Sequence, residues 1–436
     1  MKPLQVGLLG IGTVGSGTFR VLHRNQQEIQ RRAGCGIEIA MVAARNLPRA
    51  RSIVGDGVRV VGDARQVIAD PSIDVVVELI GGCGIAKALV LEAIAAGKHV
   101  VTANKALLAV HGTEIFAAAR DKGVVVAFEA AVAGGIPIIK ALREGLTANR
   151  IEWIAGIING TTNFILSEMR SKSLDFGVAL KEAQRLGYAE ADPSFDIEGM
   201  DAAHKATIMS AIAFGTPVQF AQAHVEGITQ LQAVDIRYAE QLGYRIKLLG
   251  ISRRCPEGIE LRVHPTLVPS SRLIANVEGA MNAVMVQGDA VGTTLYYGKG
   301  AGSEPTASAV IADLVDIARL HTADPQHRVP SLAFQPGSLA DTPILPIAEV
   351  VTSFYLRLRV ADEAGVLAQV TSILAGRCIS IDALLQRESG QGENQTDVII
   401  LTHDTVEGRM REAIAALQAL STVLAPIVSL RKEELA

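Results

Sequence analysis

Short apolar runs separated by helix-sized segments occupy the first part of the chain. These runs are rich in Val, Ile and Leu and have the length of strands: Gln5–Leu9, Ile37–Ala43, Val75–Leu79, His99–Thr102 and Val124–Phe128. Strands of this kind, each followed by a helix, are typical of a parallel sheet covered on both faces. The pattern predicts an α/β protein that begins with a Rossmann-type, doubly wound domain over residues 1–130.

A second region, residues 131–340, mixes helices with longer strands and is predicted to be a domain of the α+β class. Its expected elements are the strands Ile151–Ile158 and Ile259–Pro265 and the helices Asp175–Leu186, Asp201–Phe214 and Thr306–Leu320. Residues 305–320, which include the last of these helices, are expected to return to the first domain.

The C-terminal region follows a stretch from Gln335 to Pro346 that has the Pro-rich, polar composition of a linker. Residues 351–436 then show a β-α-β-β-α-β order, with Thr352–Val360, Val366–Gly376, an unassigned strand, Gln395–Thr402, Val406–Leu420 and Leu424–Leu430. This order predicts a self-contained, ferredoxin-like βαββαβ domain.

Composition and charge narrow the class of protein. The formal net charge of −4 gives no electrostatic reason to expect nucleic acid or an anionic membrane as a partner. No apolar run reaches the ~18 residues of a membrane span, and the N-terminus has no leader pattern. The cysteines have no ligand-like spacing: Cys35, Cys83, Cys255 and Cys378. We therefore expect a cytoplasmic protein with reduced thiols.

A glycine-rich loop, Gly10-Ile11-Gly12-Thr13-Val14-Gly15, follows the first predicted strand and opens a helix. Its glycines allow a tight turn and a close approach of the backbone to a pyrophosphate at the positive helix N-terminus. The motif alone is weak, because glycines also serve strand–helix packing, but its place in a βαβ unit favours dinucleotide binding.

Arg45 lies at the end of the second predicted strand, where an NAD-specific site often has an acidic residue for the ribose hydroxyls. With no acid there, Arg45 can accept a 2′-phosphate, with help from Arg49 and Arg51, so NADP is favoured over NAD. A solvated surface arginine is the alternative.

Asp201 and Lys205 are four residues apart and share one face of a predicted helix. An isolated pair of this kind is usually a surface ion pair. Here the helix is apolar enough to be buried, and the loop before it carries several acids, among them Glu190 and Asp196. Carboxylates beside a lysine on a buried element favour a polar pocket.

Motifs along nearly the whole chain resemble those of homoserine dehydrogenases. They are the glycine-rich loop, Gly97–Lys105 (GKHVVTANK), Phe128–Pro137 (FEAAVAGGIP), Asn159–Asn163 (NGTTN) and Gly187–Pro193 (GYAEADP), the last continuing through Asp196 and Asp201 to Lys205. Because no aspartokinase-like region precedes Met1, the resemblance is to the monofunctional enzymes. It implies NAD(P)-dependent interconversion of aspartate 4-semialdehyde and homoserine in threonine, methionine and isoleucine biosynthesis.

The resemblance also implies roles for particular residues in the catalytic and substrate-binding domain. Lys205 would exchange the proton with the substrate oxygen, and Lys105 would contact substrate and cofactor. Burial or a nearby cation can lower the pKa of a lysine into the range that this requires, but spacing does not decide which lysine delivers the proton. The further implied contacts are Glu190, Asp201, Asp196 and Gly187 for the substrate, and Thr102 and Gly302 for the cofactor.

Glu129 with Val132, Gly134 and Ile136 resembles the family's site for a monovalent cation such as Na+. Hard cations prefer oxygen ligands, and a glycine-containing loop lets backbone carbonyls converge. A loop kept small for packing is the alternative. The chain departs from the family after Gly81-Gly82, where Cys83-Gly84-Ile85 replaces a frequent Glu-Pro step, so the affinity or selectivity for cofactor is expected to differ.

The motif Asp362-Glu363-Ala364-Gly365-Val366-Leu367 resembles the start of an ACT domain. This resemblance implies an amino-acid effector, threonine, bound between subunits of a homodimer or homotetramer, with allosteric coupling to the catalytic site. A purely structural dimerisation module is the alternative.

Two rival functions stay open on the sequence. An aspartate dehydrogenase or a similar NAD(P) oxidoreductase would share the phosphate loop but should lack the run from Glu190 to Lys205. A catalytically inactive nucleotide or amino-acid sensor would bind without turnover, and the intact Lys105 and Lys205 argue against it.

Overall fold

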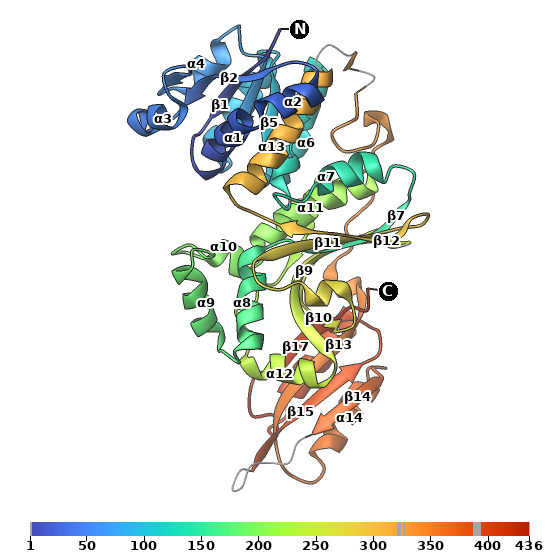
Figure 1. The fold of residues 1–436 in the computed structure, drawn as a ribbon. Coiled ribbons are helices and arrows are strands. Elements are labelled where there is room, and N and C mark those ends of the chain that lie inside the picture. Colours follow the sequence, from blue (N-terminus) through green and yellow to red (C-terminus); the bar gives the residue numbers. More distant parts are fainter. Residues whose placement is uncertain (1, 321–323, 326–327, 387–393, 436) are drawn as a thin grey trace.

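The computed structural model describes residues 2–320, 324–325, 328–386 and 394–435. The chain forms an elongated molecule with a parallel sheet at one end, a mixed sheet in the middle and the C-terminal module at the other end (Figure 1). The described part of the chain has no helix that is both long and apolar enough to span a membrane.

The N-terminal sheet has six parallel strands in the order β3-β2-β1-β4-β5-β6. This is the doubly wound order that binds dinucleotides at the carboxyl ends of its strands. Its strands are β1 (Leu4–Leu9), β2 (Ile37–Ala43), β3 (Arg59–Val61), β4 (Val75–Glu78), β5 (His99–Thr102) and β6 (Val126–Ala127). Its helices are α1 (Thr13–Arg24), α2 (Gln26–Ala33), α3 (Leu47–Val54), α4 (Ala64–Ala69), α5 (Gly84–Ala95) and α6 (Lys105–Lys122).

Helices cover both faces of this sheet, as the apolar strands require. Helices α1 and α2 pack on one face together with α13 (Ser303–Leu320), which comes from much later in the chain (Figure 1). Helices α4, α5 and α6 pack on the other face. The predicted strands at Ile37–Ala43 and His99–Thr102 are confirmed. The last strand, β6, is shorter than predicted because it is an edge strand that pairs only with β5.

The second sheet has 11 strands, and its main path runs β12-β11-β7-β9-β10-β17-β13-β15-β14. The strands of its first half are β7 (Ile151–Ile157), β9 (Tyr244–Arg254), β10 (Ile259–Pro269), β11 (Met281–Gly288) and β12 (Gly292–Lys299), with β8 (His224–Val225) beside β10. The helices of this region are α7 (Ile138–Lys140), α8 (Gly160–Ser171), α9 (Phe176–Arg185), α10 (Ser194–Ile197), α11 (Met200–Phe214) and α12 (Ala233–Gln241). Helices α8, α11 and α12 pack on one face, and β10 continues past its predicted end at Pro265 because it pairs with β9 throughout.

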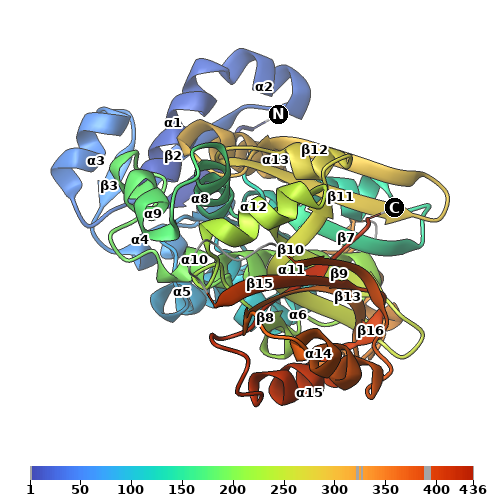
Figure 2. The same cartoon turned by 90° about the horizontal axis from the view of Figure 1, so that it is seen from below.

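The C-terminal module has the predicted order of elements but is not a separate sheet. It contains β13 (Val351–Ala361), α14 (Val366–Ala375), β14 (Ile381–Gln386), β15 (Gln395–Thr402), β16 (Thr405–Val406), α15 (Glu407–Gln418) and β17 (Val428–Lys432). Helices α14 and α15 cover its sheet on one side (Figure 2). Its last strand pairs with β10 through Thr266–Arg431 and Leu267–Lys432, so the two sheets are continuous.

Two expectations for this region are corrected by these pairings. The last strand lies at Val428–Lys432 and not at Leu424–Leu430, because its C-terminal residues form the ladder to β10. The expected linker is also attached to the sheet: the backbone of Ile259 bonds to Pro343 and Leu345, and Ile344 forms a β-bridge with Ile259.

Candidate functional site

Helix α11 places Asp201 and Lys205 one turn apart in the interior of the molecule. Their relative exposures are 2% and 8%. Lys205 Nζ lies 2.6 Å from Asp201 Oδ2 and also donates a hydrogen bond to the carbonyl oxygen of Ile158 at 2.8 Å. The prediction that this pair lies on a buried element is confirmed.

The second carboxylate oxygen of Asp201 binds a lysine from the nucleotide-binding part of the chain. Lys105 is the first residue of α6, directly after β5, and its Nζ lies 2.7 Å from Asp201 Oδ1. Its side chain is 35% exposed, compared with 10% for that of Lys205. One buried carboxylate therefore connects the two expected catalytic lysines, and Lys105 is the one that solvent reaches more easily.

The two ammonium groups differ in acidity because their surroundings differ. Burial lowers the pKa of Lys205, the charge of Lys105 lowers it further, and Asp201 offsets these effects only in part. Burial also disfavours the charged form of Lys105, but the carboxylates of Asp201, Asp196 and Glu190 outweigh it, and the pKa of Lys105 rises. Burial opposes ionisation of Asp201, yet the two lysines hold the pKa of that carboxyl well below its usual range. Lys205 is thus the lysine that releases its proton more readily.

The other expected substrate residues border this pair. Asp196, on the short helix α10, is half-buried, and burial together with the charge of Asp201 raises its pKa. Glu190 is exposed but near enough to Lys105 to raise the pKa of that lysine. Gly187 has a φ of +78° at the turn after α9, a conformation that favours glycine. The loop thus brings an exposed and a half-buried acid to the lysines.

Asn159 is a member of this cluster that the sequence reasoning did not single out. It lies between β7 and α8, and its Nδ2 donates to Asp196 Oδ1 at 2.7 Å and to Asp201 Oδ2 at 2.8 Å. Its Oδ1 caps α8 by accepting the backbone N–H of Thr162 at 2.8 Å. The NGTTN motif contained a helix-capping signal, but only the fold shows which side chains the amide nitrogen meets.

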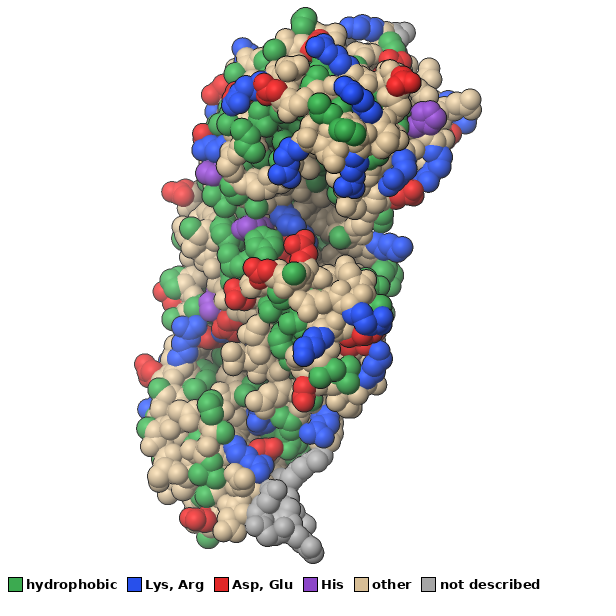
Figure 3. All heavy atoms as spheres, turned by 90° about the vertical axis from the view of Figure 1, so that its left-hand side faces the viewer, with side chains coloured by type: hydrophobic (Ala, Val, Ile, Leu, Met, Phe, Trp, Pro, Cys, Tyr) green, Lys and Arg blue, Asp and Glu red, His purple; other side chains and the backbone are tan. Residues whose placement is uncertain are grey.

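An aromatic side chain also reaches the cluster. The ring of Phe195, which is 43% exposed, has its centroid 5.8 Å from Lys105 Nζ, within the range of a cation–π interaction. On the face of the molecule shown in Figure 3, a hollow separates the nucleotide-binding part of the surface from the central part. Charged and histidine side chains lie at the edge of this hollow.

The glycine-rich loop has the geometry of a phosphate-binding turn. Gly10 has a φ of +99°, and a Cβ on Gly15 would lie 2.2 Å from the carbonyl oxygen of Gly10. A Cβ on Gly12 would instead point into open space. The backbone before α1 is therefore accessible to a pyrophosphate, as the motif predicts.

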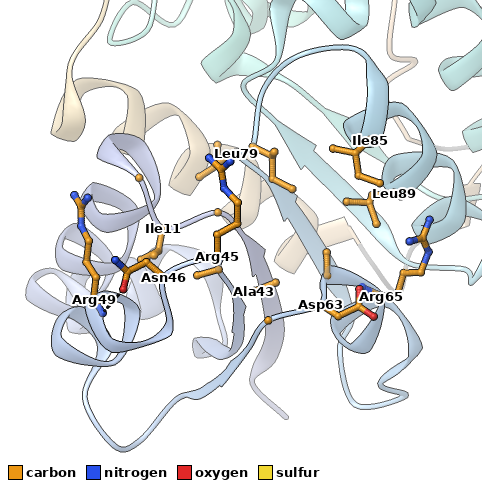
Figure 4. Close-up of a pocket in the computed structure, with 16 residues that line it drawn as sticks. Ile11, Ala43, Arg45, Asn46, Arg49, Asp63, Arg65, Leu79, Ile85 and Leu89 are labelled. Carbon is orange, nitrogen blue, oxygen red and sulfur yellow. Dashed lines mark hydrogen bonds between the residues drawn. The ribbon is translucent and has the colours of Figure 1, made fainter.

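A cavity of about 560 Å³ opens beside this loop (Figure 4). Gly10, Gly12 and Arg45 line it, together with Arg49 and residues at the start of α4 and α5. In the part of the chain that the structure describes, neither the Arg45 nor the Arg49 guanidinium has an ion-pair partner, whereas Arg65 binds Glu92 in a bidentate manner. The cavity therefore has two cations available to an anionic ligand.

Glu78 is a second residue that the sequence reasoning missed. It is fully buried at the end of β4, and its Oε1 accepts the backbone N–H groups of Ile80 and Gly81 at 2.8 and 2.9 Å. Its Oε2 accepts the hydroxyl of Thr102 at 2.7 Å. Thr102, an expected cofactor residue, is 1% exposed. Its hydroxyl helps to hold Glu78, which in turn binds the backbone of the loop after β4.

The same loop carries the departure at Cys83. Asn104 Nδ2 donates to the carbonyl oxygen of Gly82 at 2.7 Å, while its Oδ1 caps α6. The backbone directly before Cys83 is thus held by Asn104 and Glu78, and the half-buried Cys83 begins α5 on this support.

The expected cofactor residue Gly302 lies directly before α13. Its φ is +124°, and the hydroxyl of the next residue, Ser303, donates to the carbonyl oxygen of Thr13 at 2.8 Å. The glycine loop from 298 to 302 therefore meets the N-terminus of α1, beside the phosphate-binding turn.

The residues expected to bind a monovalent cation form a buried loop around Glu129. The two carboxylate oxygens of Glu129 accept the backbone N–H groups of Ile139 and Lys140 at 3.0 and 2.8 Å. Burial raises the pKa of Glu129 to about 6. The carbonyl of Ile136 accepts the N–H of Ile138. The donor set of one carboxylate and backbone carbonyls fits a hard cation, although part of it also serves local hydrogen bonds.

This loop also has the backbone conformations that such a site needs. Ala133 and Gly134 have φ values of +54° and +46°, and a Cβ on Gly134 would lie 2.5 Å from the carbonyl oxygen of Gly300. Among the described residues, no group of three His, Cys, Asp or Glu side chains could hold a metal ion. A cation at Glu129 would therefore depend on backbone oxygens.

Comparisons with known proteins agree across the whole chain. The family profile described as "Homoserine dehydrogenase" matches residues 137–315, "Homoserine dehydrogenase, NAD binding domain" matches 10–129, and "ACT domain" matches 354–421. A homoserine dehydrogenase of Pseudomonas aeruginosa is 61% identical over 435 residues, covering 100% of both chains. The chain belongs to the homoserine dehydrogenase family.

Solved structures of the family have the same fold. A homoserine dehydrogenase from Thiobacillus denitrificans superimposes with a TM-score of 0.96 at 66% identity, covering 100% of this chain and 99% of that one. One from S. aureus gives a TM-score of 0.77 at 33% identity, with 99% of each chain covered. The identification as a homoserine dehydrogenase with a C-terminal ACT domain is confirmed, and the family is an oxidoreductase family different from the aspartate dehydrogenases considered as a rival.

Ion pairs join the ACT domain of this family member to the rest of the chain, and the pair between Arg357 and Asp235 is buried. Arg357 on β13 binds Asp235 on α12, with Nε 2.6 Å from Oδ1. Arg431 on β17 binds Glu226, which precedes α12, at 2.8 and 2.9 Å, and Glu407 at the start of α15 at 2.7 and 2.8 Å. The ACT domain is therefore fixed to the catalytic region by charge pairs as well as by the shared sheet.

Proposed function

We propose that the chain catalyses the reversible, NADP-dependent reduction of L-aspartate 4-semialdehyde to L-homoserine, with NAD as a weaker alternative cofactor. The observation that carries the proposal is the contact of both Lys105 and Lys205 with the one buried carboxylate of Asp201. An aldehyde that is reduced needs a proton on its oxygen, and this arrangement supplies two ammonium groups in one polar pocket.

In this mechanism the bound nicotinamide supplies the hydride. Lys205 gives its proton to the developing alkoxide and takes it back in the reverse direction, because its pKa is lowered by burial and by Lys105. Lys105 stays charged, since the carboxylates around it raise its pKa, and it holds the substrate oxygen near the cofactor side. Asp201 orients both lysines, because its Oδ1 binds the ammonium group of Lys105 and its Oδ2 binds that of Lys205.

Recognition of the amino acid is assigned to the acids around the lysines. Glu190 and Asp201 would hold the ammonium group and the hydroxyl, Asp196 would support them, and the turn at Gly187 would let the loop approach the substrate. The negative charge of the carboxylates favours contact with the substrate ammonium group. Glu190 is exposed, so a ligand can reach it.

Cofactor binding is assigned to the cavity beside the phosphate loop. Gly10, Gly12, Thr13, Val14 and Gly15 would hold the pyrophosphate at the start of α1. Arg45 would bind the 2′-phosphate, because its guanidinium lines the cavity and has no ion-pair partner among the described residues. The remaining assigned residues are Thr102, Lys105 and Gly302, at the nicotinamide side.

A monovalent cation such as Na+ is assigned to Glu129 and to the carbonyl groups of Val132, Gly134 and Ile136. Its role would be structural, because the loop lies between the nucleotide-binding part and the helix α7. The positive φ values at Ala133 and Gly134 support a loop shaped for converging carbonyls.

The ACT domain is proposed to bind threonine between the subunits of a homodimer or homotetramer and to inhibit the enzyme. Feedback by threonine would place the reaction in the biosynthesis of threonine, methionine and isoleucine in the cytoplasm. The ion pairs that join the ACT domain to the catalytic region offer a physical route for coupling between two sites.

The deciding experiment measures initial rates of homoserine oxidation with NADP and with NAD. Wild-type protein is compared with Lys205→Ala, and the series is repeated with added threonine. Turnover that is higher with NADP, is lost in the variant and is inhibited by threonine supports each part of the proposal. Folded wild-type protein without turnover on either cofactor rules the reaction out.

A further inference from the structure

Asn159 connects the start of helix α8 to the acidic cluster and is 4% exposed. Its Oδ1 accepts the backbone N–H of Thr162 at 2.8 Å and the hydroxyl of Thr162 at 2.9 Å. Its Nδ2 donates to Asp196 Oδ1 at 2.7 Å and to Asp201 Oδ2 at 2.8 Å. One side-chain amide therefore serves a helix cap and two carboxylates at once.

The orientation of this amide is determined by the helix. A backbone N–H can only donate, so the amide oxygen has to face Thr162 and the amide nitrogen has to face the acids. Both protons of the nitrogen are then used, each on a different carboxylate. The cap of α8 thus aims a two-proton donor at the space between Asp196 and Asp201.

These two carboxylates need such a donor. Burial and the charge of Asp201 raise the pKa of Asp196, and the hydrogen bond from Asn159 counteracts them. The other titratable groups that face the cluster are Lys105 from α6, Lys205 and His204 from α11, and Glu190 from the loop before α10. Both lysines form their ion pairs with Asp201. Their charges offset the effects on Asp196 only in part, and the side-chain hydrogen bond that Asp196 accepts comes from Asn159.

We propose that Asn159 is a positioning residue for the reaction: its amide nitrogen holds Asp196 and Asp201 together as an ionised pair and so keeps Asp201 on both lysines. It acts through Asp201 and Asp196. This inference rests on the proposed function, because its effect is read in homoserine turnover.

The first test is Asn159→Asp, which keeps an oxygen for the cap of α8 and replaces the donor by a third acid. We expect kcat/KM for homoserine to fall about 30-fold, in the range that loss of hydrogen bonds to charged groups produces. In the plot of kcat/KM for homoserine oxidation against pH, the rising limb should move to a higher pH by roughly one unit. The reason is that added negative charge favours the protonated form of Lys205, which has to be neutral to accept the proton.

A second pair of variants separates positioning from folding. Asn159→Ser keeps a good N-cap residue and removes the amide nitrogen, so kcat should fall about tenfold in protein that remains folded. Thr162→Val disturbs the cap alone and should leave the pH profile unchanged, with any loss of rate following the folded fraction.

A rescue variant tests the charge argument directly. Adding Asp196→Asn to Asn159→Asp returns the number of carboxylates to that of wild type, and kcat/KM should recover about fivefold relative to the single variant, as expected for coupled neighbours. A wild-type pH limb in Asn159→Asp, or a double variant no more active than the single one, overturns the inference. Wild-type protein that does not oxidise homoserine overturns the proposed function instead, so the two failures are distinguishable.

Discussion

Arg357 and Asp235 form a buried ion pair between the ACT domain and the catalytic region, with Nε and Oδ1 2.6 Å apart and Asp235 fully buried. Tyr355 donates a further hydrogen bond to the same carboxylate at 3.2 Å. Because the pair lies between β13 and α12, removal of either partner leaves a buried charge at the junction of the two regions.

Asp235→Asn is therefore expected to lower the free energy of unfolding by about 3 kcal/mol, because the guanidinium of Arg357 loses its counter-ion in a dry site. Calorimetric unfolding measures this as a fall in Tm. The matched control is Glu304→Gln, which breaks the exposed pair with Arg24 and should change Tm little. Equal effects of the two variants would contradict the importance of the buried pair.

The contact of Glu226 with Arg431 predicts a loss of stability in acid. Burial opposes ionisation of Glu226, but hydrogen bonds from His224 and Arg431 outweigh it and hold the pKa of that carboxyl well below its ordinary value of 4.5. Its stabilising contribution is therefore complete above about pH 4.5 and is lost as the pH falls toward the folded-state pKa. Urea unfolding at neutral and acid pH should show a larger fall for wild type than for Glu226→Gln, and parallel falls would refute the assignment.

Replacement of Lys205 by methionine is expected to reduce kcat for homoserine oxidation by about 100-fold or more. Methionine fills a similar volume but cannot exchange a proton. Lys205→Arg should not restore the rate, because a guanidinium does not deprotonate in this range. Lys172→Met, at an exposed ion pair with Glu168, is the control for loss of a lysine. Activity in Lys205→Met near that of the control would point to Lys105 as the proton donor.

Arg45→Ala should change the choice of cofactor. Loss of a charge-assisted bond to a 2′-phosphate predicts a fall in kcat/KM for NADP of about tenfold or more, with little change for NAD. The ratio of kcat/KM values for the two cofactors measures this. Arg65→Ala is the control, because Arg65 is already bound to Glu92. A parallel loss with both cofactors would mean that Arg45 acts outside the phosphate site.

A cation at Glu129 would stabilise the folded protein by mass action. Tm should be higher in sodium chloride than in choline chloride at the same ionic strength, and this difference should disappear in Glu129→Gln. The comparison of two salts removes general screening. The same Tm in both salts for wild type would leave the loop with a packing role only.

Much of the fold could be predicted because local patterns dominate it. The strand Ile37–Ala43 is a short, mostly apolar run, and the glycine loop before α1 follows a strand as the motif requires. The pair Asp201–Lys205 was predictable because a helix places residues four apart on one face. Such features depend on residues close together in the chain.

The partners of these residues could not be predicted in the same way. Glu78 gave no signal, since an acid at a strand end is usually exposed, yet the fold buries it under two backbone N–H groups and Thr102. Arg431 also gave no signal. It follows the last apolar residue of the predicted strand, and a charged residue at that position usually indicates that the strand has ended. The ladder to β10 carries the strand through Arg431 and surrounds its guanidinium with Glu226 and Glu407.

By itself the sequence determined the order of the elements, the phosphate loop and the family, and it singled out Lys105 and Lys205 as the candidate catalytic lysines. Only the tertiary structure decided that Lys105 and Lys205 meet on one carboxylate, that Asn159 bridges Asp196 and Asp201, and that the ACT sheet continues the catalytic one. The physical reason is that helix and strand periodicity act over a few residues. Contacts between distant segments depend instead on how whole sheets and helices pack, which no local pattern specifies.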